Sequence, residues 1–93
     1  MVNMLTISFE ELAVYLKQGR EIEFIYNGKD YSITNSHAEW HFCCDTDGTC
    51  ITLCPFSKPD ILVEKIRKTV IDGATIEDIF NKTPGKITVC YVL

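Results

Sequence analysis

The dipeptide Asn27-Gly28 constrains the fold of this chain more than any other short motif. It separates residues 20–26 from residues 29–34, and apolar and polar residues alternate in both segments. A type I′ turn requires positive φ at both central residues, and Asn-Gly is well suited to it. The motif therefore predicts a tight β-hairpin in which Tyr26 pairs with Lys29. One face of this hairpin is predicted to be apolar: Ile22, Phe24, Tyr26, Tyr31 and Ile33.

The opposite face of this hairpin is mostly polar and carries Glu21, Glu23 and Asp30. Neighbouring carboxylates can serve acid–base chemistry. Acidic residues on a solvent-facing sheet surface more commonly keep a protein soluble and protect the sheet from pairing with other chains. We therefore expect a solvated face here.

A second hairpin is predicted around Asp47-Gly48. A two-residue turn at this dipeptide pairs Cys44 with Ile51, whereas a four-residue loop over residues 45–48 shifts the pairing by two residues and keeps the same faces. The predicted core face carries Trp40, Phe42, Cys44, Ile51 and Leu53. The predicted outer face carries His41, Cys43, Cys50, Thr52 and Cys54.

A helix over residues 8–18 is predicted before the hairpins. Ser8 and Glu11 have the spacing of a capping box, in which each side chain bonds the backbone N–H of the other residue. Gly19 suits the left-handed position that ends such a helix.

Further elements are predicted after the second hairpin. Ser57 is the expected cap of a second helix that ends at Asp72-Gly73, and Thr75 opens a short helical turn. Residues 86–92 are predicted to form a last strand because they are rich in β-branched and aromatic residues. Both faces of this strand are largely apolar, which indicates a central or covered position with Cys90 in the core.

The order of these elements predicts an α+β fold. We expect residues 1–93 to form a single domain with a twisted antiparallel sheet of about five strands, made of two hairpins and a C-terminal strand. The N-terminal helix and the helix after the fourth strand are expected to pack on one face of the sheet.

Three segments carry a resemblance to other proteins: GREIEFIYNGKDYSIT after the first helix, WHFC in the second hairpin and IDGATIEDIF near the end. In these segments the chain resembles an uncharacterised family of short bacterial hypothetical proteins with no assigned function. The matching positions are turns, caps and core residues. The resemblance implies a single cytoplasmic domain. It assigns no residue to a site, and it implies that the cysteines are not part of a shared pattern.

Charge and hydropathy narrow the classes of partner. The formal net charge is −4, and the nine Lys and Arg residues are scattered, so we expect no nucleic-acid partner. No apolar segment is long enough to span a membrane, and no secretory signal is visible at the start of the chain. We therefore expect a cytoplasmic protein whose five cysteines remain thiols unless they bind something.

The cysteine–histidine cluster of the second hairpin is the candidate site. His41, Cys43, Cys50 and Cys54 are the candidate metal ligands, and zinc is the ion considered for the less favoured metal-site interpretation. Their spacing contains no CxxC pair, and a flat hairpin does not readily wrap four ligands around one ion.

Three other interpretations of the cluster stay open. Cys43 and Cys50 lie near enough for a disulfide, which a reducing compartment opposes. A thiol beside His41 could act as a nucleophile, but no third group that orients the pair is evident. The cysteines could also serve as small apolar residues, with Cys44 in the core.

The sequence favours a non-enzymatic protein without a cofactor. We expect a small domain that acts through protein–protein contacts, as a regulator or accessory factor, including self-association through a sheet edge. The alternative is a metal-binding or redox-responsive protein that uses the outer face of the second hairpin.

Overall fold

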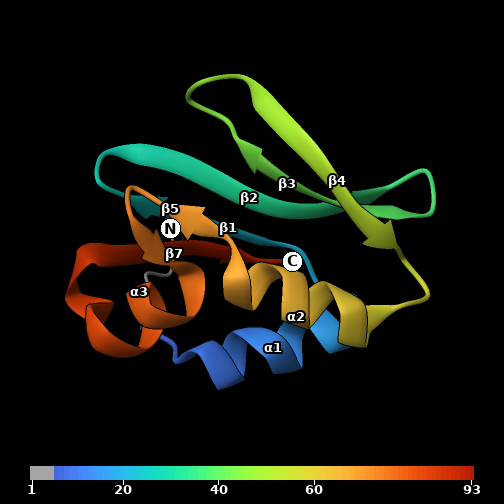
Figure 1. The fold of residues 1–93 in the computed structure, drawn as a ribbon, viewed down its shortest axis with the longest axis horizontal. Helices are drawn as coiled ribbons and strands as arrows, with labels where there is room; N and C mark the ends of the chain where they lie inside the picture. Colours follow the sequence, from blue (N-terminus) through green and yellow to red (C-terminus); the bar gives the residue numbers. More distant parts are fainter. Residues whose placement is uncertain (1–5) are drawn as a thin grey trace.

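The computed structural model describes residues 6–93 and confirms the α+β fold (Figure 1). An antiparallel sheet has the strand order β4-β3-β2-β1-β7. Its strands are β1 (Ile22–Tyr26), β2 (Lys29–Ser36), β3 (Glu39–Cys44), β4 (Thr49–Pro55) and β7 (Ile87–Val92). The helices α1 (Phe9–Lys17), α2 (Pro59–Lys68) and α3 (Ile76–Lys82) lie together on one side of the sheet (Figure 1).

The structure bears on the prediction about membranes but not fully on the prediction about export. Within residues 6–93, no helix is both long and apolar enough to cross a membrane. The prediction that the chain lacks a secretory signal rests partly on residues 1–5, which lie outside the described residues.

The predicted N-terminal helix is confirmed, together with its cap. Ser8 Oγ accepts a hydrogen bond from Glu11 N, and Ser8 N donates to Glu11 Oε1, both at 3.1 Å. This reciprocal pair satisfies two backbone N–H groups that a helix start leaves free. Gly19 has a φ of +80°, the left-handed conformation expected just after the helix.

The first hairpin is confirmed in its turn and its register. Asn27 and Gly28 have φ values of 51° and 76°, and Tyr26 pairs with Lys29. All five residues of the predicted apolar face are buried. Phe24 of this face packs edge-on against Phe80 of α3, with ring centroids 5.3 Å apart. The apolar face of the first hairpin therefore packs against the helical layer.

Arg67 of α2 links the three helices beside their shared apolar core. Its guanidinium lies 4.8 Å from the centroid of the Phe9 ring in α1 and forms an ion pair with Glu77 in α3. The backbone N–H of Phe9 also donates to Asn81 Oδ1 of α3 at 2.9 Å. One side chain thus contacts all three helices of the layer.

The second hairpin turns through a four-residue loop, not through the two-residue turn at Asp47-Gly48. Cys44 pairs with Thr49, and Gly48 N donates to Cys44 O at 2.9 Å across the loop. The loop is also held by β2, because Asp45 N donates to Asp30 O at 2.8 Å and Asp30 N donates to Thr46 Oγ1 at 2.9 Å. The Thr46 hydroxyl therefore accepts the bond from Asp30 N that the next regular pair of β2 and β3 would give to a backbone carbonyl.

A β-bulge near Trp40 corrects the predicted faces of this hairpin. His41 pairs with Thr52 but Trp40 pairs with Cys54, so Leu53 is an extra residue on β4. The extra residue turns the next side chain inward, and both Leu53 and Cys54 are buried. The prediction that Cys54 lies on the outer face is therefore wrong.

Ile51 also departs from its predicted place in the core, with 54% of its surface exposed. It shares the inner face of the hairpin with the other predicted core residues, but the hairpin extends beyond the helices (Figure 1). Trp40 is buried and stacks on Phe56, with centroids 5.4 Å apart. Its indole Nε1 is the one fully buried side-chain N or O atom in residues 6–93 that lacks a hydrogen-bond partner.

The segment after α2 forms a small hairpin where the sequence predicts the end of a helix. Helix α2 stops at Lys68, and β5 (Val70–Ile71) pairs with β6 (Ala74–Thr75) around Asp72-Gly73. Both turn residues have positive φ, 50° and 85°, as a two-residue hairpin requires.

Of the two predicted N-caps in this part of the chain, one is wrong and one is confirmed. Lys58 replaces Ser57 as the N-cap of α2, whereas Thr75 caps α3 as predicted.

Among residues 6–93, the last strand lies at an edge of the sheet, so the central position, one of its two predicted alternatives, is wrong. Within these residues strand β7 pairs with β1 alone, and a bulge leaves Cys90 without a strand partner between Val89 and Tyr91. Val89 is buried on the core face, whereas Cys90 is half-buried. The apolar character of this strand therefore does not reflect burial on both faces.

Candidate functional site

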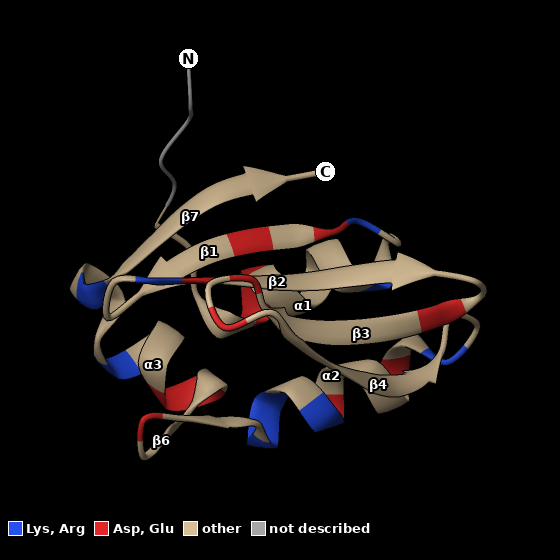
Figure 2. Ribbon diagram, turned by 90° about the horizontal axis from the view of Figure 1, so that it is seen from above, with Lys and Arg blue, Asp and Glu red and all other residues tan. Residues whose placement is uncertain are grey.

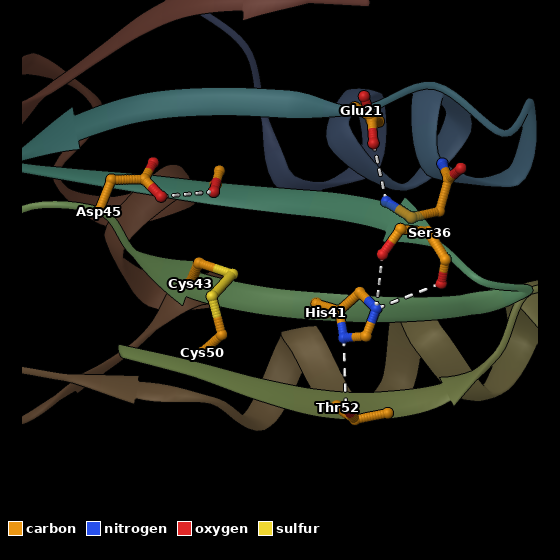
Figure 3. Close-up of a disulfide and its surroundings, with 9 residues drawn as sticks. Glu21, Ser36, His41, Cys43, Asp45, Cys50 and Thr52 are labelled. Atoms are coloured by element: carbon orange, nitrogen blue, oxygen red, sulfur yellow. Dashed lines mark hydrogen bonds between the residues drawn. A yellow bond between two sulfur atoms is a disulfide. The ribbon is translucent and has the colours of Figure 1, made fainter. Parts of the chain in front are cut away.

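The structure brings three of the four candidate ligands to the outer face of the second hairpin. His41 and Cys43 lie on β3, and Cys50 lies opposite on β4 (Figure 3). Cys54 is separated from them because it is buried on the other face, where its Sγ donates to Lys58 O at 3.7 Å. Burial raises the pKa of the Cys54 thiol, although the nearby Lys65 opposes this shift.

Cys43 and Cys50 form a disulfide, contrary to the expectation that all five cysteines are thiols. The four-residue loop places the two residues directly opposite each other, with their Cα atoms 4.0 Å apart. In an antiparallel sheet the shorter Cα spacing belongs to pairs that do not exchange backbone hydrogen bonds, whose side chains are also closer. The register of the hairpin therefore brings the two sulfur atoms together.

The two halves of the disulfide differ in their exposure to solvent. Cys43 is 6% exposed, whereas Cys50 belongs to the exposed residues. The difference follows from the order of the strands, because β3 has a neighbour on each side and β4 is the edge of the sheet. Cys50 is thus the half that a molecule in solution reaches first.

His41 is held in place by hydrogen bonds at both ring nitrogens (Figure 3). Nε2 lies 3.1 Å from Ser36 Oγ and 3.3 Å from Ser36 O, and Nδ1 lies 3.1 Å from Thr52 Oγ1. A carbonyl oxygen only accepts, so the contact with Ser36 O indicates that Nε2 carries a proton. Both ring nitrogens therefore already have hydrogen-bond partners within the sheet.

The four candidate ligands do not form one metal centre in this structure. Two sulfur atoms are joined in the disulfide, Cys54 lies on the far face, and His41 bonds to Ser36 and Thr52. Within residues 6–93, no three His, Cys, Asp or Glu side chains are grouped so that they could hold a metal ion. Zinc ligation would need free thiolates that converge.

The outer face next to the disulfide is acidic. Glu23, Ser32, Cys43 and Cys50 pair in sequence and form one row across four strands. Ser32 is buried, and its hydroxyl donates to Asp45 Oδ1 at 3.2 Å. Acidic segments lie on β1 and around the tip of the second hairpin (Figure 2).

This acidic surface changes the titration of two groups. Burial raises the pKa of Glu23, and the charges of Asp45 and Asp30 raise it further. Burial also raises the pKa of the Cys90 thiol, with smaller contributions from Glu23 and Asp30. The face therefore disfavours additional negative charge.

An apolar hollow of about 220 Å³ lies beside the edge strand β4. Two strongly exposed apolar side chains, Ile51 and Val70, flank it. The hollow is lined by Phe42, Cys44, Thr49, Cys50, Ile51, Thr69 and Val70. The sequence does not predict this hollow, because residues 69–71 read as part of a helix. The Asp72-Gly73 dipeptide was the available signal, since it equally fits a hairpin turn.

Comparisons with protein-family models, with curated proteins and with solved structures gave no match.

Reduction of the disulfide is expected to destabilise the protein. The bond spans a sequence separation of 7, and closing so short a loop stabilises the folded chain by about 2 kcal/mol. Urea denaturation followed by the fluorescence of Trp40 should therefore show a loss of this size when a reductant is added. A variant with both Cys43→Ser and Cys50→Ser is the control, because its stability should not respond to the reductant. An equal response of both proteins would contradict the prediction.

Substitution of Glu23 should reveal the acidic face through its dependence on pH. The pKa of Glu23 is raised above its ordinary value of 4.5, so its ionised form is less favourable in the folded than in the unfolded chain. Ionisation of Glu23 therefore lowers the free energy of unfolding as the pH rises from its unfolded-state pKa through its higher folded-state pKa. Glu23→Gln should therefore be more stable than the wild type at neutral pH, and the difference should vanish in acid, below both pKa values.

The same pair of denaturation curves with Glu39→Gln measures the effect of removing an exposed carboxylate elsewhere on the sheet. The prediction fails if Glu23→Gln is no more stable than the wild type at neutral pH.

Proposed function

We propose that this protein is a small non-enzymatic domain that acts through protein–protein contacts, as a regulator or accessory factor, and that β4 is its contact surface. The observation that carries the proposal is an uncharged edge strand with an exposed Ile51 beside an apolar hollow. Edge strands of natural proteins are usually protected from pairing by charges, bulges or covering segments. Within residues 6–93, the first half of β4 carries no charge and no bulge, and no further strand pairs with it.

The backbone of β4 supports pairing with another strand. The short Cα spacing of Cys43 and Cys50 identifies a pair that does not exchange backbone hydrogen bonds. Because this pattern alternates, the N–H and C=O groups of Cys50 and Thr52 point away from β3, towards the open edge. An added strand would bond to these groups.

The partner we propose is the β4 strand of a second copy. Antiparallel pairing about a two-fold axis at Ile51 would join Cys50 of each chain to Thr52 of the other. The two Ile51 side chains would then lie next to each other on one face, as in a self-complementary dimer interface. The segment TCITLCP contains no charged residue, so no like charges oppose each other across this pair.

A second candidate function is a redox-responsive protein, and the Cys43–Cys50 disulfide is the specific observation that favours it. The bond joins the edge strand to its neighbour, and its exposed half lies on the proposed contact strand. Oxidation and reduction would therefore act on the same strand that pairs with a partner.

Ile51→Lys should abolish self-association. The change replaces a buried apolar contact at the centre of the interface by two facing cations, and it should weaken the dimer by at least about tenfold. Val14→Lys is the matched control, because Val14 is 53% exposed on α1 and Ile51 is 54% exposed. Sedimentation velocity over a range of concentrations measures the three proteins.

The proposal predicts a concentration-dependent dimer for the wild type and for Val14→Lys, and a monomer for Ile51→Lys. A wild type that stays monomeric at every concentration would contradict it. So would a dimer that the two lysine variants weaken equally.

A further inference from the structure

We infer that Cys50 is a site of thiol–disulfide exchange with a small, positively charged thiol, and that Cys43 is the resolving cysteine. The inference rests on the redox-responsive candidate function and concerns the monomer, in which the β4 edge is open. It follows from three features of the disulfide: unequal exposure of its halves, its position at a sheet edge and the acidic residues around it.

Access selects the sulfur atom that is attacked. A thiolate displaces one sulfur of a disulfide by approaching along the S–S axis, from the side opposite the leaving sulfur. The disulfide runs from β3 to β4 (Figure 3), so attack at Cys50 comes from the open edge beyond β4. Attack at Cys43 would come from above β2, where Ser32 is buried and Cys43 itself is 6% exposed.

The exchange has two balanced steps. The external thiolate donates an electron pair to Cys50 Sγ, and the bond to Cys43 Sγ breaks. Cys43 leaves as a thiolate and takes a proton from water. A second thiolate of the small molecule then attacks the sulfur of the first one in the mixed disulfide. Cys50 leaves as a thiolate and takes a proton from water. Two thiols are oxidised to one small disulfide, and the cysteine pair of the protein is reduced.

The location of Cys43 makes it an efficient resolving group. It remains opposite Cys50, with the Cα atoms 4.0 Å apart in the closed pair. The mixed disulfide at Cys50 should therefore close again quickly in the wild type and accumulate only when Cys43 is replaced.

The charge of the surface selects the class of thiol. Asp45 bonds to Ser32, the direct strand partner of Cys43, and Asp30 and Glu23 extend the acidic face over β2 and β1. The whole chain carries a formal charge of −4. An aminothiol such as cysteamine should be attracted to this face, and a carboxylate-bearing thiol should be repelled.

The test compares Cys43→Ser with Cys50→Ser, both in a Cys90→Ser background so that the half-buried Cys90 thiol does not interfere; the other two free cysteines, Cys44 and Cys54, are buried. Each reduced variant is treated with cystamine, the disulfide of cysteamine, and the modified residue is identified by peptide mass spectrometry. Modification of Cys50 in the first variant should be at least about tenfold faster than modification of Cys43 in the second, because only Cys50 is accessible. Equal rates, or faster modification of Cys43, would overturn the inference.

A second arm tests the selectivity for charge. At low salt, cystamine should react with Cys50 several-fold faster than the dianionic disulfide of 3-mercaptopropionate, after each rate is divided by its rate with free cysteine. The difference should shrink in concentrated salt, because salt screens exposed charges. A ratio near one at low salt would overturn the proposed preference for a cationic thiol.

Competitive labelling of the reduced wild type with limiting iodoacetamide measures the same ratio without relying on a variant that folds. Failure of this inference is also distinguishable from failure of the redox-responsive function. If oxidising buffers leave Cys43 and Cys50 as free thiols, the redox-responsive function is wrong and this inference with it. If the disulfide forms and Cys43 reacts first, only this inference is wrong.

Discussion

The loop that joins β3 to β4 determines the chemistry of the outer face. Asp45 and Thr46 bond to Asp30 of β2, and these bonds hold the four-residue loop against the first hairpin. The length of the loop sets the register of the whole hairpin, and the register places Cys43 opposite Cys50. A shift of two residues would instead put Cys43 opposite Thr52, and no disulfide would form. The disulfide and its exposed half both depend on this constraint.

The bulge near Trp40 separates the buried from the exposed part of the same hairpin. By adding Leu53 to β4, it turns Cys54 into the core beside the stacked rings of Trp40 and Phe56. The part of β4 before the bulge keeps its free backbone edge and its exposed Ile51. One strand thus anchors the helical layer at one end and offers a surface for pairing at the other.

The sequence predicted the elements with strong local signals. The capping box of Ser8 and the turn at Asn27-Gly28 depend on neighbouring residues alone, and both have the predicted geometry. The loop over residues 45–48 was harder, because Asp47-Gly48 also fits a two-residue turn and the loop bonds to Asp30, which lies in another hairpin. The turn at His37 and Ala38 also has positive φ at both residues, without the Asn or Gly that would have revealed it.

The candidate site was predicted only in part, because local patterns do not reveal contacts between residues distant in the sequence. Alternation along β3 correctly placed His41 and Cys43 on the outer face, but alternation cannot anticipate a bulge, so Cys54 was assigned to the wrong face. The edge position of β4 and β7 depends on pairings distant in the sequence, and no local pattern encodes them. The hollow beside Ile51 arises where β5 meets this edge, which again requires the tertiary fold.

Proton NMR measures the register of the second hairpin most directly. In pairs that do not exchange backbone hydrogen bonds, the two Hα protons face each other and give a strong nuclear Overhauser effect. With the four-residue loop, we expect such an effect between the Hα protons of Cys43 and Cys50, and another between those of His41 and Thr52. A strong effect between Cys43 and Thr52 would instead show a two-residue turn at Asp47-Gly48, and it would contradict the disulfide and the site built on it.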